Sequence, residues 1–135
     1  MRTSIVFLLG TTLLLLLSGC AQAAPAATIR GQITYLQRIA LPEGAVVTVQ
    51  LVDISRADAA AVVLGEQVIT PGTQVPIPFS ISYDPTVIQD NLNYALQASI
   101  RDAQGQLWFT TTMAHFVITR GNPSDHVELL LEMVR

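Results

Sequence analysis

Short segments in which apolar and polar residues alternate constrain the fold of this chain more than any other feature. A period of two places successive side chains on opposite faces of an extended strand, whereas a helix repeats its apolar residues every three or four positions. Seven segments show the strand pattern, and turn signals such as Pro71-Gly72 and Asp84-Pro85 separate them. The predicted strands are residues 28–36, 47–51, 62–70, 77–83, 94–101, 106–113 and 127–133.

Each predicted strand has one apolar face, so two sheets packed face to face can bury a core between them. Seven short strands within about 105 residues are typical of a β-sandwich, and a chain of 135 residues is consistent with one domain. We therefore predict an all-β fold, a seven-stranded β-sandwich over residues 28–135. The expected core residues are Ile33, Val49, Leu51, Phe79, Ile81, Leu96, Ile100 and Leu129.

Two of the predicted strands have features of sheet edges. Glu66 interrupts the apolar pattern formed by Val62, Leu64 and Val68, and a charge on a strand discourages unwanted pairing. Pro76 and Pro78 lack the N–H groups that a central strand needs. An unpaired edge can add a strand from a partner, so Glu66 and Gln67 are candidate partner-surface residues. The competing interpretation is that these residues only prevent aggregation.

The first residues differ in composition from the rest of the chain. Arg2 precedes an uncharged and mostly apolar run over residues 5–17, which is shorter than the roughly 20 residues that span a membrane. It has the length of a signal-peptide core and ends in Leu17-Ser18-Gly19-Cys20, which resembles a bacterial lipobox. That resemblance implies a signal peptide over residues 1–19, lipid on Cys20, and a short tether over residues 20–27. Ala21 after the cysteine implies sorting to the outer membrane. The alternative is an ordinary secretory signal with an incidental cysteine.

Composition argues against nucleic-acid binding, metal binding and catalysis by this chain. The net charge is −3 and no lysine is present, which gives no basic surface for nucleic acid. The single cysteine excludes an intrachain disulfide and any thiolate cluster. His115 and His126 have no acid at metal-ligand spacing, and although Asp125 precedes His126, neighbours on a strand point to opposite faces. The aspartates fall mostly at strand ends, where they usually bond their own turns. We expect no catalytic residues, no metal and no cofactor.

The loop after the first strand is a second candidate surface. It contains Arg38-Ile39-Ala40-Leu41-Pro42, in which Ile39 and Leu41 can cover an open end of the sandwich. Arg38 is expected to pair with Asp53 or Asp58 if it has a structural role, and to contact a partner if it has a functional one.

Several blocks of sequence resemble the YbaY family of bacterial lipoproteins, which is grouped with the YscW-type lipoproteins, or pilotins, of type III secretion. The most specific block runs from Gly31-Gln32-Ile33-Thr34-Tyr35 through Arg38-Ile39-Ala40-Leu41-Pro42 to Val52-Asp53-Ile54-Ser55. Pro78-Phe79-Ser80-Ile81-Ser82-Tyr83-Asp84-Pro85 and Gly105-Gln106-Leu107-Trp108-Phe109 also match. The resemblance covers about residues 29–134. It implies a transthyretin-like or immunoglobulin-like sandwich and a lipid-anchored envelope protein.

Three functions follow as alternatives. The leading hypothesis is a non-enzymatic, lipid-anchored protein of the bacterial envelope that binds or chaperones another envelope component. The second is a pilotin proper, which would bind an outer-membrane secretin subunit and help it assemble. The third is a periplasmic glycan-binding protein, which would need an exposed platform built from Trp108, Tyr35, Tyr83 or Tyr94.

Overall fold

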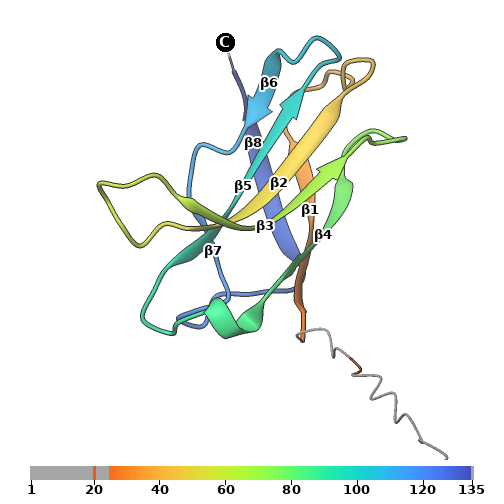
Figure 1. The fold of residues 1–135 in the computed structure, drawn as a ribbon. Coiled ribbons are helices and arrows are strands. Elements are labelled where there is room, and N and C mark those ends of the chain that lie inside the picture. Colours follow the sequence, from red (N-terminus) through yellow and green to blue (C-terminus); the bar gives the residue numbers. More distant parts are fainter. Residues whose placement is uncertain (1–19, 21–24, 135) are drawn as a thin grey trace, which may run out of the picture.

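The structure, a computed structural model, describes Cys20 and residues 25–134. These residues form eight strands and one short 3-10 helix, and Figure 1 shows their arrangement. The strands are β1 (Ala27–Tyr35), β2 (Val46–Asp53), β3 (Val62–Ile69), β4 (Ile77–Tyr83), β5 (Tyr94–Arg101), β6 (Leu107–Thr110), β7 (His115–Val117) and β8 (Val127–Met133). The 3-10 helix η1 (Pro85–Val87) lies between β4 and β5.

The strands form one continuous path in the order β3-β2-β5-β6-β8-β1-β4, and β7 pairs with β5 beside β6. The path folds into two layers. A smaller sheet contains β4, β1 and β8, and a larger sheet contains β3, β2 and β5 together with β6 and β7. All pairs are antiparallel except β1 and β8, which run parallel. The β6–β8 pair joins the layers through Phe109↔Met133 and Thr110↔Glu132. The predicted all-β fold is confirmed, and its strand path nearly closes on itself as in a barrel.

The core lies between the layers, as the alternation predicts. All eight residues expected in the core are buried, and the ring of Tyr35 stacks on Phe109 with centroids 4.0 Å apart. Gly31 in β1 allows β8 to approach closely, because a Cβ atom there would collide with the carbonyl oxygen of Val127 and come within 2.8 Å of Phe79 Cζ. Burial of this many apolar side chains is the main source of stability for such a domain.

Two details differ from the predicted strands. The predicted strand over residues 106–113 ends at Thr110, and a separate strand, β7, pairs with the start of β5. Between them the chain leaves the sheet while Thr111 stays bonded to Ala98, its N–H donating to the Ala98 carbonyl oxygen and its hydroxyl oxygen accepting from the Ala98 N–H. A turn signal is absent at this break, so the sequence pattern did not indicate it.

The apolar face predicted for β3 is also wrong. Leu51 pairs with Gly65 but Val52 pairs with Val63, so β3 has one extra residue at this point. Such a bulge changes which side chains face the core. Gly65, Gln67 and Ile69 take the partly buried positions at the end of the strand, whereas Val68 is 59% exposed. The Val62, Leu64 and Val68 pattern therefore does not mark a buried face.

The molecule has two different ends. At the end where β1 begins lie η1, β7 and the start of β8, in the lower part of Figure 1, and the 54–61 loop projects from the same end of β2 to the left. At the opposite end lie the 36–45 loop, the 70–76 loop, the β5–β6 turn and the C-terminus. We call the first of these the anchor end, after the lipid anchor expected on Cys20 seven positions before β1, and the second the distal end.

Candidate functional site

The residues expected to form a partner surface do not make one patch. Arg38 is exposed in the loop at the distal end, and Glu66 is exposed on β3. Gln67 is only partly exposed and faces β4. Cys20 is exposed, whereas the expected signal peptide over residues 1–19 and most of the tether lie outside the described residues. Among the residues that the structure describes, no helix is long and apolar enough to cross a membrane.

Strands β3 and β4 are the two ends of the strand path, as the edge signals predict. They lie against each other, because a Cβ atom on Gly65 would come within 2.7 Å of the Ser82 carbonyl oxygen. The Oε1 atom of Gln67 accepts a hydrogen bond from the Ser80 N–H at 2.6 Å. We call this contact between β3 and β4 the seam. The side chain of Gln67 thus occupies the β4 edge that an added strand would need.

Glu66 points away from the seam, onto the outer face of the larger sheet. Its Oε2 atom accepts a hydrogen bond from Gln50 Nε2 at 2.6 Å. Gln50 is its direct neighbour across the β2–β3 pair. Glu66 is therefore an exposed acid held in place by a neutral partner.

The Arg38 loop is fixed at both sides of the arginine. The Tyr35 hydroxyl donates to the Ile39 carbonyl oxygen at 2.9 Å, and the Leu41 N–H donates to Gln74 Oε1 at 2.7 Å. The expected pairing of Arg38 with Asp53 or Asp58 is wrong. The loop precedes β2 at the distal end, whereas Asp53 ends β2 and Asp58 follows it at the anchor end.

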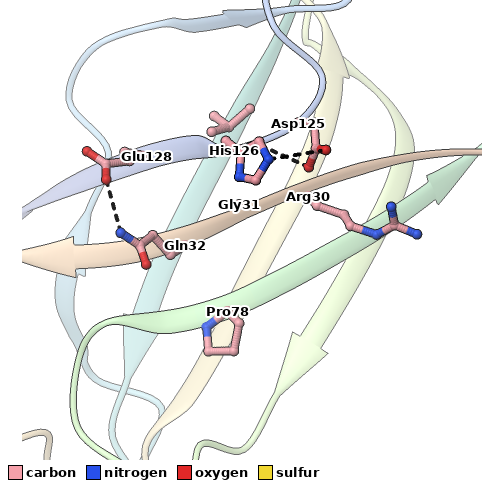
Figure 2. A pocket seen from close by; sticks show the side chains of 8 residues that line it. Arg30, Gly31, Gln32, Pro78, Asp125, His126 and Glu128 are labelled. Carbon is pink, nitrogen blue, oxygen red and sulfur yellow. Dashed lines mark hydrogen bonds and ion pairs between the residues drawn. The ribbon is translucent and has the colours of Figure 1, made fainter.

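A shallow groove of about 350 Å³ lies on the outer face of the smaller sheet (Figure 2). Side chains from three strands line it, including Arg30 and Gln32 of β1, Pro78 of β4 and Glu128 of β8. Gln32 Nε2 donates to Glu128 Oε1 at 3.0 Å. The groove holds both charge signs, and its charged groups are open to solvent, so their charges are well screened.

Asp125 and His126 also line this groove, and they lie together in contrast to the prediction. His126 precedes β8 with φ at 53°, outside regular strand geometry, and its Nε2 atom lies 3.6 Å from Asp125 Oδ2. The prediction of opposite faces applied strand geometry to a loop. Both side chains are largely exposed, and no nucleophilic side chain lines the groove with them. A solvated pair of this kind lacks the positioned third group that base-assisted catalysis needs.

Three of the aspartates at strand ends, Asp53, Asp84 and Asp102, bond their own turns as expected. Asp53 Oδ1 accepts from the hydroxyl and the N–H of Ser55, and these bonds lower the pKa of Asp53. Asp84 caps η1 by accepting from Thr86 in the same way, which lowers the pKa of Asp84. Hydrogen bonds that stabilise the charged form favour ionisation. These carboxylates are therefore turn-forming groups rather than poised acids.

The aromatic residues do not form an exposed platform. Tyr35 and Tyr94 are buried, and the Tyr94 hydroxyl accepts from the Gln89 N–H at 3.0 Å. Trp108 is partly buried, and its Nε1 atom donates to Asp102 Oδ2 at 3.1 Å. The expected glycan-binding alternative therefore has no support in the described part of the chain. Within that part, no group of three or more His, Cys, Asp or Glu side chains is placed to hold a metal ion.

Comparison with known proteins shows which family this chain resembles. The family described as "Type III secretion system lipoprotein chaperone (YscW)" matches residues 24–129. A relative named "Uncharacterized lipoprotein YbaY" from Escherichia coli (strain K12) is 35% identical over 103 residues, covering 76% of this chain and 54% of the relative. The chain therefore spans about half the length of that relative.

A solved structure extends the likeness from sequence to fold. It is described as the structure of an alternative pilotin from the type II secretion system of Vibrio cholerae. The two chains are 40% identical with a TM-score of 0.76, and the match covers 82% of this chain and 99% of that one. The match to more than half of the chain, together with these relatives, shows that the protein belongs to the YscW family of secretion-system lipoprotein chaperones.

Proposed function

We propose that this protein is a pilotin-type lipoprotein, which binds a secretin subunit and assists its assembly at the outer membrane without catalysing a reaction. The observation that carries the proposal is the likeness to a pilotin structure over 99% of that chain, since the whole of that fold is represented here. The family is described from type III secretion and the structure from type II secretion. The proposal therefore covers secretins of either system.

The proposed anchor is lipid on Cys20, following removal of residues 1–19. Leu17-Ser18-Gly19-Cys20 supports this modification, and several acyl chains together give stable membrane attachment. Ala21 supports sorting to the outer membrane. Ala27, the first residue of β1, lies seven positions after Cys20, and a fully extended chain of that length spans at most about 25 Å. The sandwich would be held close to the membrane in which a secretin assembles.

The proposed client surface lies around Arg38 at the distal end. Leu36 is 78% exposed and Ile39 is 41% exposed, so apolar side chains flank an exposed cation. The bond from the Tyr35 hydroxyl and the bond that Gln74 accepts order the loop before a client arrives, which lowers the entropy cost of binding. Glu66 is a second candidate contact on β3. Gln67 would contribute by holding the seam closed rather than by touching the client.

The test is to co-express the protein with the secretin of its own organism and to separate inner and outer membranes on a density gradient. Wild-type protein is expected to bring assembled secretin multimers to the outer-membrane fraction, and Cys20→Ser is expected to leave them in the inner-membrane fraction. Arg38→Glu should weaken secretin capture, whereas Arg56→Glu at the anchor end is the matched control and should not.

Two results would contradict the proposal. If secretin multimers reach the outer membrane equally well without the protein, it does not act as a pilotin. If the purified protein turns over a glycan or peptide substrate, the non-catalytic part of the proposal is wrong.

A further inference from the structure

The outer face of the larger sheet changes character along its length. Around the middle of β2 and β5 the outward side chains are polar, and a hollow there is lined by Thr48, Gln50, Gln97, Ser99 and Thr110 together with Ala98. Toward the anchor end the next row is apolar across all four strands. Val63 of β3 pairs with Val52 of β2, Val52 pairs with Ala95 of β5, and Ala95 pairs with Phe116 of β7. We call these four residues the apolar row.

The apolar row is buried in its centre and open at both ends. Val52 and Ala95 are each 1% exposed, although they point away from the core of the sandwich. Val63 is 49% exposed and Phe116 is 47% exposed. Directly paired residues share one face of a sheet, so the four apolar side chains lie in line. Only Val63 and Phe116 offer exposed apolar surface, and the protein itself covers Val52 and Ala95 between them. Exposed apolar surface that is grouped on one face marks interaction sites more often than isolated apolar residues do.

A neighbouring segment adds apolar surface near the row. Met113 just before β7 is 72% exposed and lines a hollow together with Ala95 of the row. No charged residue belongs to the apolar row, so a partner does not need a charge of either sign to bind there.

The position of Cys20 indicates what covers the exposed ends of the row, Val63 and Phe116. The tether enters the fold at the same end, and its length of at most about 25 Å keeps this end near the membrane. We propose that the apolar row docks on the lipid surface, so that the anchor end faces the bilayer and the distal end faces the periplasm. This inference rests on the lipid anchor of the proposed function and adds a defined orientation to it. Apolar side chains that sit at the headgroup boundary are buried there by about 5–10 Å.

The sequence offers a clean probe for this orientation. Cys20 is the only cysteine, and in the acylated protein its sulfur is occupied, so one introduced cysteine can be labelled alone. The full acylated protein would be prepared as Val63→Cys and, separately, as Leu36→Cys at the distal end. Each would be labelled with a nitrobenzoxadiazole fluorophore and placed in phosphatidylcholine vesicles. Dithionite, which does not cross the bilayer, then bleaches whichever labels face water.

The label at position 63 is expected to bleach about tenfold more slowly than the label at position 36, since its site is covered by lipid. Adding Phe116→Glu to the Val63→Cys protein should restore fast bleaching. Leu130→Glu, on the exposed outer face of the smaller sheet, is the matched control and should not. Circular dichroism checks that each variant is folded.

Equal bleaching at both positions in vesicle-bound protein would overturn the orientation while leaving the anchor intact. Protection at position 63 that appears only after secretin is added would also overturn it, because the row would then be a client surface. If the protein fails to enter vesicles and mass spectrometry finds an unmodified Cys20 thiol, the anchor itself is absent and both proposals fall.

Discussion

The two layers of this sandwich meet along two sides that are closed by different means. On one side β6 and β8 pair through their backbones, and beyond them the Val134 N–H donates to the Trp108 carbonyl oxygen at 2.9 Å. On the other side β3 and β4 end the strand path, and the Gln67 side chain bonds the Ser80 N–H across the seam. A strand path can therefore be nearly closed without a full backbone ladder, provided that a side chain satisfies the exposed edge.

The difference matters for what the edges can bind. An unpaired edge is a template for another strand, and proteins protect such edges with charges, prolines or covering groups. At the seam, Pro78 lacks an N–H group, the Ser80 N–H is occupied, and Gly65 allows close contact with Ser82. These features favour a seam that resists strand addition, so the proposed contact surface lies at the distal loop instead.

The largest expected effect on stability comes from a substitution in β4. It tests whether core packing or the Gln67 hydrogen bond holds this strand in place. Phe79 is buried in β4 and packs close to Gly31, so Phe79→Ala removes a large side chain from the shared core. We expect the free energy of unfolding to fall by about 3–5 kcal/mol. Val68→Ala, at an exposed position of the other seam strand, should change it by less than about 0.5 kcal/mol. Urea denaturation followed by circular dichroism measures both.

An equal, small effect of both substitutions would contradict this packing. It would mean that β4 contributes little to the core and that the seam depends mainly on the Gln67 bond.

The alternation of side chains was enough to predict the sandwich and the eight core residues. It succeeded because apolar positions such as Val49 and Leu96 follow a strict period of two within strands that are buried on one face. It also located the edges, since a charge and prolines have a direct meaning for backbone pairing. Alternation, the charge and the prolines are local features of single strands, so they can be recognised in the sequence without knowing which strands pair.

Features that depend on two distant segments were not predictable. The bulge in β3 is defined by its pairing with β2, and the interruption between β6 and β7 by pairing with β5. Gln67 was singled out as an exposed contact, but its bond to Ser80 depends on β4 lying opposite. The apolar row was missed because its four residues come from four strands. Only the register brings Val63, Val52, Ala95 and Phe116 together.

A smaller effect is expected when the seam bond alone is removed. Gln67→Ala leaves the Ser80 N–H without its acceptor and should lower the free energy of unfolding by about 1–2 kcal/mol. Gln67→Glu keeps an acceptor oxygen at the same distance and is the matched control, expected to retain most of the stability at neutral pH. Hydrogen exchange measures the local consequence, since the Ser80 amide should exchange faster in Gln67→Ala than in Gln67→Glu. Unchanged exchange at Ser80 would show that the bond is not formed in solution.

The smallest expected effect is that of acid on the free energy of unfolding. It should differ between the side closed by the β6–β8 pair and the seam. On the paired side, Asp102 in the β5–β6 turn accepts from the backbone N–H groups of Gln106 and Gln104 and from the Trp108 indole. The bond from the Gln106 backbone is the main cause that lowers the pKa of Asp102 below its ordinary value of 3.8. The unfolded chain therefore binds this proton before the folded chain does. The stabilising contribution is complete above pH 3.8 and is lost as the pH falls through the lowered pKa.

The seam bond between Gln67 and Ser80 contains no ionisable group, so acid should not weaken it. Urea midpoints of the wild type and of Asp102→Asn should differ at pH 7 and converge as the pH falls below about 4, whereas the difference between wild type and Gln67→Ala should persist. The Asp102 carboxylate is exposed to solvent, so the convergence should be modest and smaller at high salt. A difference for Asp102→Asn that stays constant with pH would mean that its turn is held by shape rather than by charge. The Asp102 turn and the Gln67–Ser80 bond would then respond to acid alike, although only the turn is held by a carboxylate.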